Sequence, residues 1–367
     1  MKAAVCYGPG DVRVEDIDDP RPSAGEVKIE VAAVGVCHTD LNFARGAVAV
    51  PYPIVLGHEG AGVVVETGPG VTGVTVGDHV VCSIIGPCEQ CFYCLRDEPA
   101  LCERSPLFTG TMLDGTTRLS RQGSPIHTLH YQGSYAEAAI VPDRFVTPVR
   151  RDAPLDVVCG LACGVATGLG AAMVRARVAP GSSVVVVGAG GVGLSTMLGA
   201  RFLGATTVVA VDRVARKVEK ALELGLATHG VDASSAEPVA AVLELTAGRG
   251  ADYGFDAAGV PGTLDQVVAA TRPGGTAVVI GRSMAQVEVT FDTTVLLRQR
   301  TVTGTYGGSI HPRRHLPEFV DLYMQGLLDI GKVLDARYAL DDAARALDDL
   351  HQGRNTRGVI VVRDGRS

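Results

Sequence analysis

The sequence predicts an α/β domain inserted into a β-rich domain, in a chain of 367 residues. Short apolar runs broken by Gly and Pro fill the first 150 residues, and such closely spaced runs are typical of a barrel-like β domain. From about residue 153, strand-like runs alternate with helical stretches, the pattern of βαβ units around a parallel sheet. After residue 301 the pattern becomes mixed again. We therefore expect the chain to leave the β-rich domain and return to it.

The expected elements follow in chain order. Strands of the β-rich domain are expected at 26–34, 62–65, 78–83 and 135–141. In the α/β domain, strands are expected at 184–187, 207–211, 251–256 and 276–280, with helices at 192–203, 215–224 and 263–271. The run 184–187 is all valine, which favours a buried strand. The last part should contain helices at 316–325 and 340–352 and a closing strand at 358–362.

The composition is that of an ordinary globular protein. Hydrophobic residues make up 46% and charged residues 20% of the chain, which excludes intrinsic disorder, and the length suits about two domains. Asp and Glu outnumber Lys and Arg by 40 to 33, and the net charge of −7 argues against nucleic acid or an anionic membrane as partner. The N-terminal residues lack the apolar segment of a signal peptide, and no run approaches the roughly 20 residues of a membrane span. We expect a cytoplasmic protein.

A glycine pattern follows the strand at 184–187 and opens the next helix. It consists of Gly188, Gly190, Gly191, Val192 and Gly193, with Ala189 between the first two. In a Gly-x-Gly-x-x-Gly pattern, the first glycine allows a tight turn, the second lets the backbone approach a pyrophosphate, and the third allows close helix–strand packing. The helix N-terminus then offers N–H groups to the phosphates. The pattern predicts a dinucleotide site, and the alternative is a Gly-rich turn without a ligand.

The strand after this helix ends in Asp212. A carboxylate there can accept hydrogen bonds from the adenine ribose hydroxyls and would repel a 2′-phosphate, so NAD is favoured over NADP. Arg213 follows immediately and would weaken that preference. Lys217 lies one turn into the next helix and can reach the same ribose.

Four of the nine cysteines are closely spaced in a segment that is otherwise loop-like. They are Cys88, Cys91, Cys94 and Cys102. Four thiolates at such spacing can surround one tetrahedral ion, so we predict a structural zinc site. An iron–sulfur cluster is disfavoured because the ferredoxin motif has a shorter last interval and a following proline. A pair of disulfides is disfavoured because the sequence has no secretion signal.

A second group of possible ligands is dispersed along the chain. Cys37-His38-Thr39-Asp40 follows one strand, Gly57-His58-Glu59 follows a Pro-rich loop, and Cys163 opens the α/β domain. The run Gly57-His-Glu-x2-Gly62-x5-Gly68-x2-Val71 resembles the signature of zinc-containing alcohol dehydrogenases of the medium-chain dehydrogenase/reductase family. The four-cysteine segment, the Cys163 segment and the glycine pattern follow in the family's order. The resemblance covers essentially the whole chain.

The resemblance implies that Cys37, His58 and Cys163 bind a catalytic zinc, with water or the substrate oxygen in the fourth position. Asp40 is similar to the carboxylate that holds the zinc-binding histidine by its other ring nitrogen. Glu59 matches the family's glutamate behind the metal, which can approach the ion during ligand exchange.

Further residues match family positions, and a surface or packing role is their alternative. Thr39 corresponds to the hydroxyl that hydrogen-bonds the alcohol oxygen and passes on its proton. His38 and Arg357 correspond to residues that bind the cofactor pyrophosphate, and Thr167 lies where the family packs the nicotinamide. The family's proton-relay histidine is replaced by Asn42, which cannot act as a base, so the last relay step is open. If Asn42 takes no part, Asn42→Ala should barely alter the pH–rate profile.

The family's architecture implies a GroES-like β-rich catalytic domain with an inserted Rossmann domain, a doubly wound parallel sheet. The expected limits are 1–164 with 307–367 for the first, including a structural-zinc lobe at 86–104, and 165–306 for the second. Family members carry the active site between the domains, hold two Zn²⁺ per chain, and form homodimers or homotetramers. By analogy, residues 287–305 would contribute to the dimer.

The implied activity is reversible oxidation of an alcohol to an aldehyde or ketone, with zinc as Lewis acid and NAD as hydride acceptor. The segment 110–120 also resembles thiol-dependent formaldehyde dehydrogenases, which oxidise an S-hydroxymethyl thiol adduct and can reduce S-nitrosothiols. The apolar loop 45–53 lacks the acidic residues that meet glutathione in those enzymes, so we favour an uncharged alcohol. A non-catalytic NAD-binding redox sensor is the remaining alternative, and the complete set of expected zinc ligands argues against it.

Overall fold

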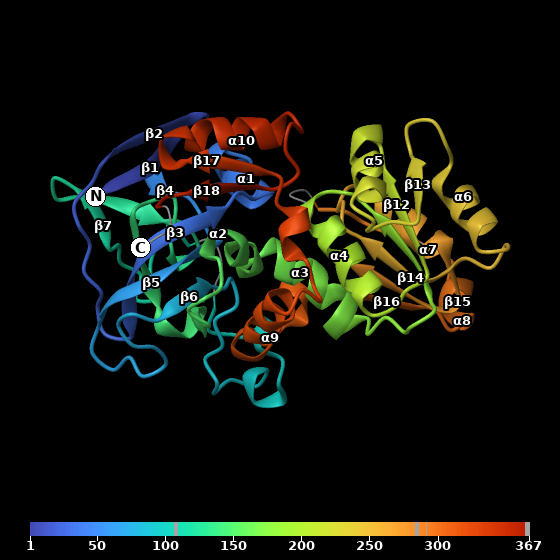
Figure 1. Cartoon of the computed structure of the whole chain (residues 1–367), viewed down its shortest axis with the longest axis horizontal. Helices are drawn as coiled ribbons and strands as arrows, with labels where there is room; N and C mark the ends of the chain where they lie inside the picture. Colours follow the sequence, from blue (N-terminus) through green and yellow to red (C-terminus); the bar gives the residue numbers. More distant parts are fainter. Residues whose placement is uncertain (106–108, 283–285, 291, 364–367) are drawn as a thin grey trace. The chain divides into compact units, whose positions relative to one another are not determined.

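The computed structural model describes residues 1–105, 109–282, 286–290 and 292–363. The chain divides into two compact units (Figure 1). The first unit is Met1–Cys163 together with His311–Ser367, and the second is Gly164–Ile310. Both parts of the chain that flank the second unit therefore fold together. The prediction of an α/β region inserted into a β-rich one is confirmed.

The first unit is built around the long strand β3 (Glu26–Gly35). This strand pairs antiparallel with β5 (Gly60–Thr67), β9 (Ala138–Pro142) and β18 (Gly358–Val361), and the last pairing brings the returning chain into the N-terminal sheet. The same sheet contains β6 (His79–Cys82), β10 (Val146–Val149) and β17 (Ala336–Ala339). Val27, Ile29 and Val31 alternate along β3 and enter one core cluster, as the period of two of a strand requires.

A second sheet of the first unit has the strand order β2–β1–β4–β8–β7. Its strands are β1 (Lys2–Gly8), β2 (Asp11–Asp16), β4 (Ile54–Val55), β7 (Leu119–Arg121) and β8 (Ser124–Thr128). These strands lie outside the ranges predicted from the sequence. Most are short, and β2 is largely charged and nowhere fully buried, so no apolar run marks it.

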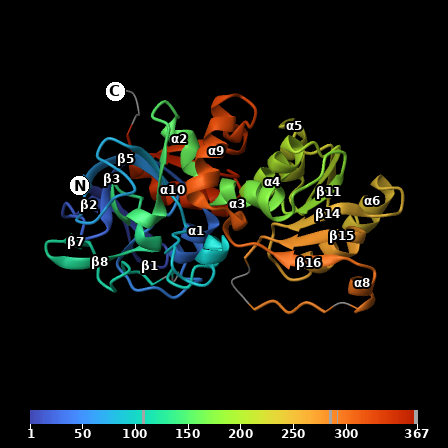
Figure 2. The same ribbon diagram turned by 90° about the horizontal axis from the view of Figure 1, so that it is seen from below.

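The second unit contains a six-stranded sheet in which all pairings are parallel (Figure 2). In spatial order its strands are β13 (His229–Asp232), β12 (Thr207–Asp212), β11 (Ser183–Val187), β14 (Ala251–Asp256), β15 (Thr271–Val279) and β16 (Thr301–Gly304). The valines of β11 are buried, as is typical of the middle of a parallel sheet. The strand order reverses between β11 and β14, where such sheets bind ligands beyond the carboxyl ends of the strands.

Helices α4 (Gly191–Phe202), α5 (Ala215–Glu223) and α7 (Thr263–Ala270) of the second unit lie within a residue of their predicted limits. The other described α-helices are α1 (His38–Ala44), α2 (Leu155–Val158), α3 (Gly164–Gly170), α6 (Pro238–Leu245), α8 (Thr294–Leu297), α9 (Pro312–Met324) and α10 (Ala343–His351). The expected start of α9 at residue 316 is wrong. The helix begins at Pro312, because a proline at the first helical position needs no N–H and already has a helical φ.

Among the described residues, no single helix is both long and apolar enough to cross a membrane. By length and composition alone, one pair of consecutive helices, Leu155–Ala162 and Gly164–Arg175, reaches that criterion when its two members are joined.

Candidate active site

Four side chains from three separate segments of the first unit converge. The ligand atoms of Cys37, His58, Glu59 and Cys163, which we call the metal group, all lie within 4.8 Å of one another. Strand pairing explains the convergence, because β3 and β5 are in register at Val34 and Gly60 and the Gly35 N–H donates to the Glu59 carbonyl. Cys37 follows the end of β3 as the N-cap of α1, and His58 and Glu59 immediately precede β5.

Asp40 orients the His58 ring. Its Oδ1 accepts the Gly57 N–H at 2.9 Å and lies 3.0 Å from His58 Nδ1, and both side chains are almost completely buried. His58 Nε2 is buried and has no hydrogen-bonding partner among the described residues, so it is the nitrogen available to a metal. Burial opposes protonation of this imidazole, but the Asp40 carboxylate and the Cys37 sulfur outweigh it and raise the pKa of His58 well above its usual value.

The pKa values of the two cysteines of this group shift in opposite directions. A hydrogen bond from Cys163, together with His58, lowers the pKa of Cys37 well below that of an ordinary thiol. The same contact and burial raise the pKa of Cys163 well above it. Thiolate, imidazole and a nearby carboxylate are the donor set of a catalytic zinc site, and bound metal would displace the remaining thiol proton. The residues therefore fit a zinc ion.

Glu59 and Arg357 form a buried ion pair. Their side chains are 0% and 4% exposed, and burial raises the pKa of Glu59 to about 7 although the Arg357 charge opposes the shift. A Cβ at Gly35 would lie 2.0 Å from Glu59 Oε2, which explains the glycine at the end of β3. The Arg357 backbone is held in turn by Asp335, whose Oδ1 accepts its N–H at 2.9 Å. Glu59 and Arg357 have separate predicted roles, whereas in the structure they form one ion pair.

Four other residues singled out from the sequence lie on short helices. His38 is exposed and Thr39 half-buried, both in the first turn of α1, and Asn42 is half-buried one turn further along. Thr167 is half-buried on α3 and belongs to the second unit.

The four-cysteine segment also forms a cluster. The sulfurs of Cys88, Cys91, Cys94 and Cys102 lie within 4.8 Å of one another. The Cys88 N–H donates to the Cys102 sulfur at 3.4 Å, and hydrogen bonds led by the Cys94 N–H lower the pKa of Cys91 to about 6. None of the nine cysteines, all within the described residues, is in a disulfide, so the disulfide alternative is wrong.

The glycine pattern of the second unit has the geometry expected of a dinucleotide loop. Gly188 has φ +98°, and a Cβ there would lie 2.7 Å from the Ala258 nitrogen. A Cβ at Gly193 would lie 1.8 Å from the Gly188 carbonyl oxygen, so this glycine allows α4 to pack against the loop. At Gly190, the N-cap of α4, a Cβ would meet no atom within 4 Å. The space beside Gly190 is therefore open, as the approach of a pyrophosphate requires.

Asp212 ends β12 beside this loop. Its Oδ2 accepts the Ala189 N–H and its Oδ1 accepts the Val214 N–H, each at 2.9 Å. The carboxylate is half-buried and fixed by the backbone. Arg213 is exposed, and Lys217 is half-buried on α5.

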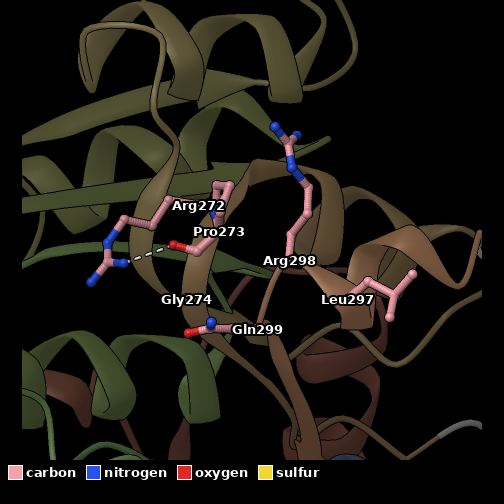
Figure 3. Close-up of a pocket in the computed structure, with 6 residues that line it drawn as sticks. All are labelled: Arg272, Pro273, Gly274, Leu297, Arg298 and Gln299. Carbon is pink, nitrogen blue, oxygen red and sulfur yellow. Dashed lines mark hydrogen bonds between the residues drawn. The ribbon is translucent and has the colours of Figure 1, made fainter.

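A hollow of about 470 Å³ lies on the second unit (Figure 3). It is lined by Arg272, Pro273, Gly274, Leu297, Arg298 and Gln299. The Arg272 side chain donates to the Pro273 carbonyl at 2.8 Å and points away from Arg298. None of the predicted site residues lines this hollow, so it is distinct from the two metal-ligand groups and from the dinucleotide loop.

The buried segment 129–135 packs against the metal group but contains no residue that was predicted for the site. The His130 ring centroid lies 5.1 Å from that of His58. Gln132, Ser134 and Tyr135 are fully buried in the same segment. The only sequence signal was an apolar run at 135–141, which we interpreted as a strand, whereas β9 begins at Ala138.

The family comparisons agree with this geometry. Residues 23–151 match the family model described as an alcohol dehydrogenase GroES-like domain, and residues 191–325 match the model described as a zinc-binding dehydrogenase. The chain is 38% identical over 368 residues to the NDMA-dependent alcohol dehydrogenase of Amycolatopsis methanolica, covering 98% of each chain. It is 37% identical over 374 residues to the S-(hydroxymethyl)glutathione dehydrogenase of Paracoccus denitrificans, covering 98% of this chain and 99% of that one.

Solved structures give the same result. The crystal structure of benzyl alcohol dehydrogenase from Acinetobacter calcoaceticus matches with a TM-score of 0.92 and 35% identity over 98% of this chain and 99% of that one. That of an alcohol dehydrogenase zinc-binding domain protein from Burkholderia ambifaria matches with a TM-score of 0.93 and 35% identity over 99% of both chains. The predicted GroES-like and Rossmann architecture is confirmed. The chain therefore belongs to the zinc-containing alcohol dehydrogenases of the medium-chain dehydrogenase/reductase family and is an oxidoreductase.

Proposed function

We propose that this alcohol dehydrogenase transfers a hydride reversibly between an uncharged primary or secondary alcohol and NAD, giving an aldehyde or ketone. The observation that carries the proposal is the convergence of Cys37, His58 and Cys163, with Glu59 beside them, within 4.8 Å. When bound, zinc supplies a Lewis acid that lowers the pKa of an alcohol, and the nicotinamide supplies a hydride acceptor.

The residues around this group have distinct tasks in the proposal. Cys37, His58 and Cys163 hold the ion and leave one position for substrate. Asp40 fixes the ring of His58 through Nδ1, at 3.0 Å. The hydroxyl of Thr39 accepts the substrate proton and passes it on, and Asn42 leaves the final transfer to water.

Other residues bind and orient the dinucleotide. The open side of Gly190 and the N-terminus of α4, with Gly191, Val192 and Gly193, receive the pyrophosphate. Asp212 accepts hydrogen bonds from the adenine ribose and disfavours NADP, with Lys217 beside it and Arg213 at the surface. His38 and Arg357 also contact the pyrophosphate. For this contact, Arg357 has to replace its ion pair with Glu59 by an ion pair with the phosphate. Thr167 packs against the nicotinamide.

A thiol-adduct activity is the second candidate. The identity to the S-(hydroxymethyl)glutathione dehydrogenase of Paracoccus denitrificans favours it. The loop 45–53 contains no acidic residue for a charged tripeptide. Its Val48, Val50 and Tyr52 pack partly against the core of the first unit, so its apolar character also serves folding. We therefore keep the uncharged alcohol as the first choice.

A substrate panel separates the two candidates. NAD and NADP reduction should be followed with benzyl and aliphatic alcohols and, in parallel, with formaldehyde plus glutathione or mycothiol, alongside a metal count per chain. We expect two zinc ions, turnover of the free alcohols and preference for NAD. Activity confined to formaldehyde plus thiol would favour the second candidate. If the metal-loaded protein binds NADH but turns over no carbonyl, the result would favour the non-catalytic NAD-binding redox sensor.

We further propose that the domain limits are those of the family, 1–164 with 307–367 and 165–306. We propose that the enzyme acts in the cytoplasm as a homodimer or homotetramer. Sedimentation of the purified protein tests its assembly.

A further inference from the structure

A strained turn lies against the metal group. In the short helix Leu129–Tyr131, His130 and Tyr131 have positive φ values of 50° and 62°, and Gly133 follows with φ 58°. Consecutive non-glycine residues in the left-handed region are uncommon and persist only where surrounding contacts hold them. The turn directs the side chain of Gln132 into the protein, where it is completely buried.

The Gln132 amide makes four hydrogen bonds. Its Nε2 donates to the His58 carbonyl at 3.0 Å and to the Cys82 carbonyl at 3.3 Å. Its Oε1 accepts the Gly60 N–H at 3.3 Å and the Ser134 hydroxyl at 2.8 Å. A primary amide has two donor hydrogens and two acceptor positions, so the hydrogen-bonding capacity of Gln132 is fully used.

These bonds complete the fixation of the backbone that carries His58. The Tyr135 N–H donates to the Leu56 carbonyl at 2.9 Å, and the Ser134 N–H donates to the Gly57 carbonyl at 3.0 Å. After Gly57, the bonds from this segment come from a side chain instead of the backbone. Gln132 donates to the His58 carbonyl and accepts the Gly60 N–H.

The close fit extends to the glycine after Glu59. A Cβ at Gly60 would lie 2.6 Å from the Ser134 hydroxyl and 3.4 Å from Gln132 Oε1, so only glycine lets this segment approach. The ring of His58 is thus oriented by Asp40 through Nδ1, while its backbone is held from the other side by Gln132.

We infer that Gln132 is a positioning residue for the catalytic metal, acting through the backbone on both sides of Glu59 and set in orientation by Ser134. The inference rests on the proposed function, in which His58 binds zinc. Gln132 touches neither substrate nor cofactor in this role. Its loss should loosen His58 and speed release of the catalytic ion, while the four-cysteine site, held by its own loop, keeps its ion.

The test uses the holoenzyme and its two zinc ions, with the structural site as internal reference. Release of each ion into a chromophoric chelator is timed for the wild type, Gln132→Met and Ser134→Ala. Met has nearly the shape of Gln but makes none of the four bonds. We expect Gln132→Met to release one ion about tenfold faster and the other at the wild-type rate, since loss of a residue supporting a metal ligand typically costs ten- to a hundredfold in affinity. Ser134→Ala, which removes one bond, should show a smaller acceleration of the same ion.

A matched control separates positioning from general destabilisation. Thr246→Val removes two buried hydrogen bonds in the second unit, to the Val242 carbonyl and from the Gly250 N–H. It should lower the thermal midpoint without changing the ratio of the two release rates. Unchanged release from both sites in Gln132→Met, or equal acceleration of both, would overturn the inference. If Gln132→Met does not fold, Ser134→Ala tests the inference: faster release of one ion alone supports it, and unchanged or equally accelerated release of both ions overturns it. A wild type that holds only the four-cysteine ion would instead refute the proposed function.

Discussion

At the scale of single residues, the metal group is defined by what its polar atoms contact. Asp40 occupies Nδ1 of His58 and leaves Nε2 directed to the group. Glu59 keeps its place beside the ligands because Arg357 compensates its charge in a fully buried position. Burial raises the pKa of Glu59 to about 7 even with this partner, and loss of the Arg357 charge would raise that pKa further.

We expect Asp40→Asn to lower kcat/KM and zinc affinity by about ten- to a hundredfold, because the amide lacks the charge that orients and polarises His58. Steady-state kinetics and zinc content after dialysis measure the effect. Asp11→Asn, at an exposed ion pair with Arg13, is the control and should behave like the wild type. Full zinc content and activity in Asp40→Asn would show that the ring is held by other contacts.

At the scale of elements, the candidate site residues lie at the ends of strands and helices. The β3–β5 register brings Cys37 and His58 together, and the β11–α4 turn presents Gly190. The glycines of that turn differ in their surroundings, because a Cβ at Gly193 would meet the Gly188 carbonyl oxygen whereas a Cβ at Gly190 would meet no atom within 4 Å. Their substitutions should therefore have different consequences, although the chemical change is the same.

Gly193→Ala should destabilise the protein by about 1–3 kcal/mol, since the new methyl overlaps the Gly188 carbonyl oxygen. Gly190→Ala should change stability by no more than about 0.5 kcal/mol, because nothing lies within 4 Å, but should weaken NADH binding. Thermal unfolding and NADH fluorescence titration distinguish the two. Wild-type NADH affinity in Gly190→Ala would place the pyrophosphate elsewhere.

The start of α9 should depend on pH. His315 Nδ1 accepts the His311 N–H at 2.8 Å, which requires the unprotonated nitrogen. Burial, with the charge of Arg314, lowers the pKa of His315 below its usual value of about 6.5 although Glu318 opposes the shift. Because the folded state disfavours protonation, the stabilisation is complete above the unfolded pKa and is lost as pH falls below it.

We expect the wild type to be more stable than His315→Gln by about 0.5–1.5 kcal/mol at pH 7.5, and the gap to narrow at pH 5.5. Thermal midpoints at the two pH values measure it. A gap that stays constant would mean that His315 does not titrate in this range.

At the scale of the whole molecule, the predicted zinc ligands and the predicted dinucleotide loop belong to different units. All seven predicted zinc ligands lie in the first unit, whereas the glycine pattern and Asp212 lie in the second. Each unit has its own core and sheets. The predicted zinc ligands and the glycine loop with Asp212 therefore belong to different units, although His38 and Arg357, which we propose also contact the pyrophosphate, belong to the first.

Removal of the catalytic zinc with a chelator should abolish activity and leave NADH affinity nearly unchanged. NADH fluorescence titration of the depleted enzyme checks this, and added Zn²⁺ should restore turnover. Loss of NADH binding together with the metal would show that the zinc site supports the dinucleotide site.

Local patterns in the sequence predict the inserted α/β region, the glycine turn and the four-cysteine group, because apolar periodicity and short cysteine intervals act within one segment. The dispersed residues Cys37, His58 and Cys163 were predicted only through the family resemblance, because no local spacing connects them. The sequence did not reveal the charged strand β2 or the start of α9, where little apolar pattern exists. Only the tertiary structure joined Arg357 to Glu59, 298 residues away, and Gln132 to the backbone of His58. Such contacts depend on strand register and a strained turn, which bring together side chains with no fixed spacing in the chain.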